Sequence, residues 1–305
     1  MRWHRPLLIL TAAMAALTVV TLVGIVADDR VLLGAPVWLK PFKFAISFAV
    51  YAATLAWMLA VLPRRSRFAE WAGTVIVAVS VIEVAIIAFQ AARGHRSHFN
   101  DTNPFDERLW SIMGASIMVL FVAHLAIGVV ALRQRLPDRV SAYAIRLGLF
   151  LSLLGMAAAV PMVTPMQDPG LEGISGAHAV GVPDGGPGLP VTGWSTTGGD
   201  LRIGHFVGLH GLQFLPLLAL LLTRRTRLGE KTGARLILVA GLAYAGMVVL
   251  LTWQALRGQP LLRPDGLTLA ALAGLLVATA VAVPVVLRTS DAPRTRSRRP
   301  VARLR

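Results

Sequence analysis

The chain contains no cysteine, so the function classes that depend on thiolate chemistry are excluded from the outset. A disulfide framework, an iron–sulfur cluster and a thiolate metal site all require cysteine. Charged residues are scarce too, at 15% of the chain, whereas an ordinary soluble domain has about 25%. Hydrophobic residues make up 55% of the chain. This balance excludes a typical soluble globular protein and indicates a membrane protein.

Acidic residues are few: 15 Asp and Glu stand against 30 Lys and Arg, giving a formal net charge of +15. The basic residues gather in alternate connections between hydrophobic segments, at 64–67, 133–139, 224–231 and 288–305. Loops rich in Lys and Arg stay in the cytoplasm in membrane proteins. We therefore predict that these connections and both chain ends are cytoplasmic. The positive charge then reflects topology, and nucleic acid is not expected as a partner.

Hydrophobic segments of roughly 20 residues recur along the chain, which is the length that a helix rising about 1.5 Å per residue needs to cross a bilayer. Only helices or closed barrels satisfy their backbone hydrogen bonds in lipid. We predict an all-α, polytopic transmembrane helix bundle over residues 1–287, with the lipid bilayer as its surroundings. Arg dominates over Lys, as in proteins of GC-rich bacteria, so the expected location is a bacterial cytoplasmic membrane. The eight predicted spans are 7–27, 37–62, 69–91, 110–132, 140–163, 202–223, 233–256 and 267–287.

Two polar segments lie outside the predicted spans. Residues 288–305 form a basic tail that we expect to be disordered and to lie against anionic lipid headgroups at the cytoplasmic face. Residues 164–201 form an outer loop rich in Gly and Pro. A loop of this length is either a lid over a site or a disordered connector. We favour a partial lid, because its end at 194–200 runs directly into the polar start of the next span.

Two helix ends carry nearly the same sequence, which suggests an internal repeat. One reads Gln90-Ala-Ala-Arg93-Gly94 and the other Gln254-Ala-Leu-Arg257-Gly258, and each helix follows an Arg-Arg-x-Arg segment, at 64–67 and 224–227. Four spans in each half would give a parallel four-plus-four repeat. Chance is the alternative, because helix ends often take Gly and Arg. If the repeat is real, a site is expected near the axis between the halves.

The polar start of span 37–62 and a buried carboxylate are the strongest candidates for a functional site. Lys40 and Lys43 stand there in a chain that otherwise uses Arg almost throughout. Interfacial anchoring is the alternative, since Lys side chains extend to the headgroups. Glu83 is the one acidic residue deep within a predicted span. A carboxylate at this depth must face the bundle, pair with a cation or be protonated, and Lys43 is its expected partner.

Two further segments concentrate polar side chains on the outer side. Residues 93–103 hold several donors, acceptors and imidazoles, and a metal site at His95, His98 and Asp101 competes there with a solvated loop. Span 202–223 begins with His205 and His210, which a regular helix places on different faces. The ligand-binding residues that we predict are Lys40, Lys43, Glu83, Gln90, Arg93, His98, Asn100, His205, His210, Gln213 and Gln254.

Two segments resemble a family of bacterial multi-pass membrane proteins to which no activity is assigned. They read Trp38-Leu-Lys40-Pro41-Phe-Lys43-Phe44 and Gln90-Ala-Ala-Arg93-Gly-His-Arg-Ser97-His98-Phe99-Asn100. The four-plus-four plan is also similar in topology to haem A synthase, which carries haem-ligating histidines on the second and fourth helix of each half. Here His124 and His210 occupy one such helix in each half, but spans 37–62 and 267–287 contain no histidine.

Three functional interpretations remain open from the sequence. The first is an outward-facing intramembrane polar pocket that binds a small, possibly anionic ligand. The second is a b-type haem protein in electron transfer, with His124 or His98 pairing with His205 or His210. The third is an intramembrane enzyme that uses Glu83 and His210 as an acid–base pair. The first is favoured because several independently placed polar residues converge on one layer near the outer surface.

Overall fold

The computed structural model describes residues 3–163, 173–225 and 228–289, and within them it contains eight helices long and apolar enough to cross a membrane. The predicted helical bundle with eight spans is confirmed. The helices are α1 (Arg5–Ala27), α2 (Leu39–Val61), α3 (Arg67–Arg93), α4 (Pro104–Arg133), α5 (Arg139–Ala157), α6 (Val160–Val163), α7 (Arg202–Arg225), α8 (Glu230–Leu256) and α9 (Gly266–Arg288). The short α6 continues the span of α5. The predicted tail falls almost wholly outside the described residues.

Helix α4 begins at Pro104, six residues before the start of the predicted span at 110. Its first turn is polar, so hydropathy does not detect it. Asn103 caps this turn, because its side-chain oxygen accepts hydrogen bonds from the backbone N–H groups of Phe105 and Asp106 at 3.1 and 3.0 Å. Pro104 suits the first helical position, since its missing N–H would have no partner there. Capping therefore extends the helix beyond its apolar part.

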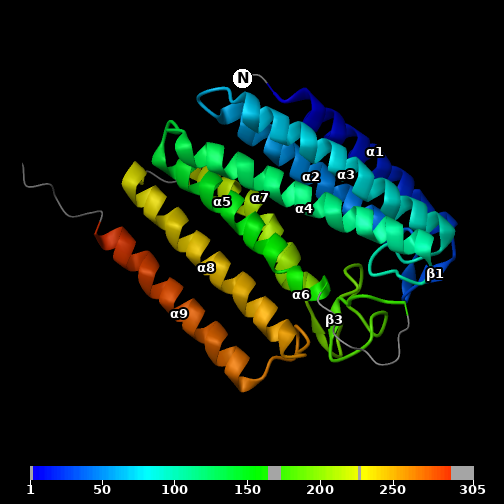
Figure 1. Ribbon diagram of the computed structural model, residues 1–305. Coiled ribbons are helices and arrows are strands. Elements are labelled where there is room, and N and C mark those ends of the chain that lie inside the picture. Colours follow the sequence, from blue (N-terminus) through cyan, green and yellow to red (C-terminus); the bar gives the residue numbers. More distant parts are fainter. Residues whose placement is uncertain (1–2, 164–172, 226–227, 290–305) are drawn as a thin grey trace, which may run out of the picture.

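The helices form two groups of four in chain order, and both groups pack in the same pattern (Figure 1). In the first group, α1 packs on α2, both pack on α3, and α3 packs on α4. In the second group, α5 packs on α7, both pack on α8, and α8 packs on α9. The groups meet where α4 packs against α5 and where α2 approaches α7. The boundary between them therefore runs along α2, α4, α5 and α7.

Glycine allows a close helix contact between α5 and α7. A Cβ atom added at Gly155 would collide with the backbone of Gly208 and Leu209. Small residues at such crossings let two helix backbones approach closely in membrane proteins. This crossing brings α7 within hydrogen-bonding reach of α5, and the ring of His205 donates from Nδ1 to the carbonyl oxygen of Gly155 at 2.7 Å.

Short strands and turns cover one end of the bundle, which we name the loop end. Strands β1 (Val31–Leu32) and β2 (Ala35–Pro36) pair there, as do β3 (Ala179–Val180) and β4 (Gly199–Asp200). The described part of the long connection, 173–201, also contacts the α3–α4 turn, since Ser175 N–H donates to the carbonyl of Phe99 at 3.1 Å. Its first residues, 164–172, lie outside the described residues. We name the opposite end, with 64–67 and 133–139, the arginine end.

The two similar helix ends adopt the same local structure at the loop end. Nε2 of Gln90 donates to the carbonyl of Arg96, six residues on, at 3.2 Å. Nε2 of Gln254 likewise donates to the carbonyl of Pro260, six residues on, at 2.8 Å. A glycine with positive φ, near 70° in both cases, follows each helix: Gly94 directly after α3, and Gly258 two residues after the end of α8. The similar sequences of the two segments therefore form the same kind of helix cap.

The arginines of these two segments also occupy equivalent positions. Arg93 forms an ion pair with Asp106 at the start of α4, with 2.6 Å between Nη1 and Oδ1. Arg257 forms an ion pair with Asp265 at the start of α9, with 2.6 Å between Nη2 and Oδ2. Each guanidinium also lies over an aromatic ring four residues earlier. In both groups, the third long helix is therefore tied to the fourth in the same way.

Candidate functional site

A cavity of about 870 Å³ lies at the loop end, between the two groups of helices. Helices α2, α3 and α4 line it from the first group, and α5, α6 and α7 line it from the second. Parts of the connections 31–38 and 178–195 complete its wall. Most of the lining is apolar, with a few polar side chains among it, which is the usual composition of a ligand-binding pocket. Five of the predicted ligand-binding residues line it: Lys40, Lys43, Glu83, His98 and His205.

Lys40 and Lys43, in the first turns of α2, differ in how their ammonium groups are satisfied. Nζ of Lys43 donates to the carbonyl of Thr192 at 3.0 Å and so ties α2 to the loop. Nζ of Lys40 has no hydrogen-bond acceptor among the described residues, although Lys40 lines the cavity. It interacts electrostatically with Glu83 and Asp184. An ammonium group in a mostly apolar wall with unused donors is suited to an anionic ligand.

Glu83 lies on α3 and is only 1% exposed, as expected for a carboxylate that faces the bundle. Its Oε1 atom has no hydrogen-bond partner among the described residues. The sequence favours Lys43 as its partner, but the cation that interacts with it is Lys40. Lys43 does not take this role because its ammonium group is hydrogen-bonded to the carbonyl of Thr192 in the loop. Glu83 and Lys40 therefore form the charged pair of the cavity.

His98 lies in the turn between α3 and α4, where aromatic rings surround it. Its ring centroid is 5.5 Å from that of Trp110 and 5.7 Å from that of Phe44. Its Nδ1 atom shares a hydrogen bond of 3.1 Å with Oγ of Ser97. Burial lowers the pKa of His98 well below its usual range, and the positive charge of Lys40 adds to the effect. At neutral pH the ring is therefore uncharged.

His178 and Asp184 form a cavity-lining pair that the sequence does not reveal. Nδ1 of His178 lies 2.7 Å from Oδ2 of Asp184, and Oδ1 of the same carboxylate accepts from Ala179 N–H at 2.8 Å. Burial lowers the pKa of His178. Burial alone would raise the pKa of Asp184, but hydrogen bonds from His178 and the backbone hold it well below its usual range. The only signal in the sequence is the turn Pro183-Asp-Gly-Gly186.

Arg202 and His205 reach the cavity from the first turn of α7. Arg202 is held by a two-point ion pair with Asp200, at 2.9 Å from Nε and 2.6 Å from Nη2. Its charge is thus largely compensated. His205 donates from Nδ1 to Gly155, which leaves its Nε2 as an acceptor in the neutral ring. The charged lining consists of Lys40, Lys43, Arg96 and Arg202 against Glu83 and Asp184.

Four predicted ligand-binding residues instead stabilise helix ends. Gln90 and Arg93 both donate to Oδ1 of Asp106, at 2.9 and 2.6 Å, and Asp106 is fully buried. Asn100 donates to the carbonyl of Arg96 at 2.9 Å and holds the turn between α3 and α4. Gln254 caps α8 as described above. None of the four lines the cavity.

His210 and Gln213 lie deeper along α7 and outside the cavity lining. Nδ1 of His210 lies 3.4 Å from Oε1 of Gln213, and His210 is exposed on the surface of the bundle. Nε2 of Gln213 donates to Oγ1 of Thr54 on α2 at 3.1 Å. This hydrogen bond joins the two groups of helices below the cavity. Glu83 and His210, predicted as an acid–base pair, therefore do not share the cavity.

His124 is fully buried on α4, and both its ring nitrogens have hydrogen-bond partners. Its Nε2 lies 3.3 Å from the carbonyl oxygen of Leu149, so Nε2 carries the proton. Its Nδ1 then accepts from the hydroxyl of Tyr51 at 2.8 Å. A ring engaged at both nitrogens is a packed core histidine. This geometry gives no support to His124 as a haem ligand.

Among residues 3–163, 173–225 and 228–289, no group of three or more His, Asp or Glu side chains is arranged to hold a metal ion. The metal alternative at His95, His98 and Asp101 depends on these three side chains meeting. In the structure, His95 pairs instead with Asp106, at 3.1 Å between Nδ1 and Oδ2. The ring of His98 packs instead beside that of Trp110.

Comparisons of the sequence and of the structure with known proteins found no matching family, no similar curated protein and no similar solved structure.

Proposed function

We propose that this multi-pass membrane protein binds a small anionic ligand in the cavity at the loop end. The observation that carries the proposal is Lys40, a cavity-lining ammonium group without a hydrogen-bond acceptor among the described residues. Its neighbour Glu83 keeps one carboxylate oxygen unpaired in the same wall. A carboxylate or phosphate group of a ligand would accept the hydrogen bonds that Lys40 has to donate.

The histidines of the cavity define a second requirement on the ligand. His178 and His205 each use Nδ1 within the protein, so in the neutral ring Nε2 is an acceptor. A ligand that contacts them needs a hydroxyl or amine donor. The remaining lining is apolar, from Phe44, Trp110 and Ile117 among others. The ligand class is therefore a small organic anion that also carries a polar donor and an apolar body.

The orientation follows from the distribution of basic residues. The clusters at 64–67 and 133–139 lie at the arginine end, and Lys- and Arg-rich loops favour the cytoplasm. The loop end, with its cavity, then faces outward, and both chain ends are cytoplasmic. A bacterial cytoplasmic membrane is the location that fits the composition.

A binding function is favoured over transport by what lies below the cavity. The hydrogen bond from Gln213 to Thr54 and the His124–Tyr51 pair join helices there. Below them the packed side chains of Leu55, Ile76 and Ile127 fill the bundle. A transporter needs a path from the cavity to the other side of the membrane. These contacts block such a path between the cavity and the arginine end.

The chain is further proposed to contain a parallel four-plus-four repeat. The same packing pattern in the two groups of helices and the same capping at Gln90 and Gln254 support it. The second long helix of each group, α2 or α7, contributes basic residues from its first turn to the cavity. A site between the halves is where a repeat of this kind places it.

The b-type haem interpretation is the less supported alternative. Of its four candidate histidines, His124 is hydrogen-bonded at both nitrogens and His210 lies outside the cavity lining. His98 and His205 do line the cavity. An absorption spectrum of the purified protein tests this alternative directly, because a Soret band that shifts on reduction would establish it.

The proposed function is tested by measuring thermal stability of the detergent-purified protein with phosphate, succinate and hexanoate, at constant ionic strength. Succinamide and hexanol serve as neutral counterparts. A ligand that binds only the folded state raises the melting temperature. We expect an anion to stabilise the protein and its neutral counterpart not to. The shift should be lost in Lys40→Gln and kept in Arg133→Gln, which removes a positive charge from an exposed position at the arginine end. Equal shifts in both variants would contradict the proposal.

A further inference from the structure

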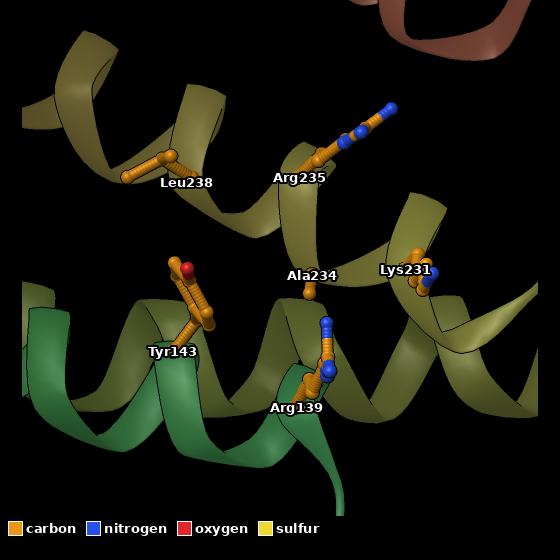
Figure 2. Close-up of a pocket in the computed structure, with 6 residues that line it drawn as sticks. All are labelled: Arg139, Tyr143, Lys231, Ala234, Arg235 and Leu238. Atoms are coloured by element: carbon orange, nitrogen blue, oxygen red, sulfur yellow. The ribbon is translucent and has the colours of Figure 1, made fainter. Parts of the chain in front are cut away.

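A second, smaller pocket lies at the arginine end, in the groove between α5 and α8, far from the cavity at the loop end. Its volume is about 210 Å³. Figure 2 shows the six side chains from two helices that line this groove, with Arg235 extending away from Arg139 and Tyr143. They are Arg139 and Tyr143 from α5, and Lys231, Ala234, Arg235 and Leu238 from α8. The spacings of three and four residues place each set on one side of its helix.

Basic side chains dominate the charge of this groove, because Arg139, Lys231 and Arg235 line it and no acidic residue does. The side chains of Arg139 and Lys231 have no hydrogen-bond or ion-pair partner among the described residues. Arg235 turns towards α9, where its Nη1 lies 3.4 Å from Oγ1 of Thr289. The carboxylate of Glu230, at the start of α8, accepts from the backbone N–H of Arg139 at 2.7 Å. Two cations of the groove are therefore available to an anion.

The groove changes from basic to apolar along the helices. Tyr143 and Leu238 lie about one helical turn further from the arginine end than Arg139 and Ala234 do. Figure 2 shows these two side chains next to one another, beside the basic ones. Tyr143 is 38% exposed, and an exposed Tyr with an apolar neighbour is typical of the membrane interface. Ala234, which is 5% exposed, leaves room at the base of the groove.

We propose that this groove binds the headgroup of an anionic phospholipid, with its phosphate between Arg139 and Lys231. The glycerol and the first acyl carbons then lie against Tyr143 and Leu238. Basic pockets between transmembrane helices at the cytoplasmic side bind lipid headgroups in this way. The basic part of the groove matches the phosphate of a phospholipid, and the adjoining apolar part matches its glycerol and acyl carbons. A free phosphate would leave the apolar part of the groove unused.

The test is native mass spectrometry of the full chain in mild detergent, titrated with phosphatidylglycerol, phosphatidylcholine or glycerol phosphate. The groove variant is Arg139→Gln/Lys231→Gln. Its matched control is Arg133→Gln/Arg135→Gln, which removes the same charge from two exposed arginines of the α4–α5 connection that do not line the groove. We expect the groove variant to bind phosphatidylglycerol at least tenfold more weakly than the unaltered chain. The control should bind within twofold of it.

A further variant, Ala234→Met, fills the groove without changing any charge and should weaken phosphatidylglycerol binding as well. Retained helix content by circular dichroism establishes that each variant is folded. Equal losses in the groove variant and the control would overturn the proposal in favour of general surface attraction. Equal affinity for phosphatidylcholine would overturn it too, as would binding of glycerol phosphate as tight as that of the lipid.

Discussion

Lys40 and Lys43 illustrate how neighbouring residues of one type take different roles. Lys43 has a partner within the protein, the carbonyl of Thr192, and so stabilises the fold. Lys40 has none among the described residues, and its charge is repelled by Arg202 and Lys43 and attracted by Asp184 and Glu83. A buried polar group without a hydrogen-bond partner costs about 1–3 kcal/mol. Residues arranged for a ligand commonly reduce the stability of the unliganded protein in this way.

Replacing both members of the charged pair, in Lys40→Met/Glu83→Gln, is accordingly expected to leave the unliganded protein as stable as before, or more stable, since no carboxylate then stays buried without its cation. Lys43→Met should lower its stability by about 1 kcal/mol, because the hydrogen bond to Thr192 is lost. The melting temperatures of the two variants in the same detergent provide the comparison. A large loss of stability in Lys40→Met/Glu83→Gln would show that the charged pair has a structural role.

His98 makes the stability of the loop end depend on pH. Burial keeps its pKa well below the usual range in the folded protein, whereas the unfolded chain takes up the proton near pH 6.5. The unfolded state therefore binds more protons as the pH falls below about 6.5, and folding stability decreases. We expect the melting temperature to fall between pH 7 and pH 5. The fall should be smaller in His98→Gln, which cannot titrate, and an unchanged pH profile would contradict this explanation.

At the scale of elements, the contact between α5 and α7 sets the geometry of one cavity wall. Their backbones approach at Gly155 and Gly208, and the same contact fixes the ring of His205 through the carbonyl of Gly155. The orientation of a cavity-lining imidazole is therefore determined by the absence of a side chain on a neighbouring helix. A hydropathy pattern contains no information about such a contact.

Gly155→Ala is expected to destabilise the protein by about 1–3 kcal/mol, because the added methyl group forces α5 and α7 apart. Gly128→Ala on α4 is the matched control. No atom lies within 4 Å of a Cβ added there, so the change should be neutral or stabilising, as alanine favours helix more than glycine does. Chemical denaturation of both variants gives the measurement, and equal effects would contradict the proposed role of the crossing.

For the whole molecule, the helices could be predicted from the sequence because the bilayer imposes a length and a composition on every span. The start of α4 could not, since its first turn depends on the cap at Asn103. The site could be predicted only in part. Lys40, Glu83 and His98 stand out because polar residues are costly in or near a membrane. The roles of His178 and Asp184 could not be predicted, because these residues reach the cavity only through the way the long loop folds over the helices.

Gln90 and Gln254 show why residue type alone does not identify a ligand-binding side chain. Both are predicted to bind a ligand, and in the structure each amide caps its own helix. Local hydrogen bonding to the backbone and binding of a ligand require the same residue types. Only the positions of the acceptors separate the two roles, and those positions come from the tertiary structure.

The central claim is an outward-facing cavity that attracts anions, and one measurement tests both parts of it. The chain lacks cysteine, so Gly114→Cys introduces a unique thiol. Gly114 lines the cavity, and a Cβ atom there meets no atom within 4 Å. The reaction rates of this thiol with the membrane-impermeant sulfonatoethyl and trimethylammonioethyl methanethiosulfonates are measured in spheroplasts. For each position, the rate with the anionic reagent is divided by the rate with the cationic reagent. This ratio for Gly114→Cys is then compared with the ratio for Thr197→Cys, an exposed position in the loop.

We predict that Gly114→Cys reacts from outside and favours the anionic reagent by about tenfold relative to Thr197→Cys. Adding Lys40→Gln should remove this preference while leaving the thiol accessible. A thiol that neither reagent reaches from outside would contradict the outward orientation. An equal ratio at the two positions, or a preference for the cationic reagent, would contradict a cavity built for an anion.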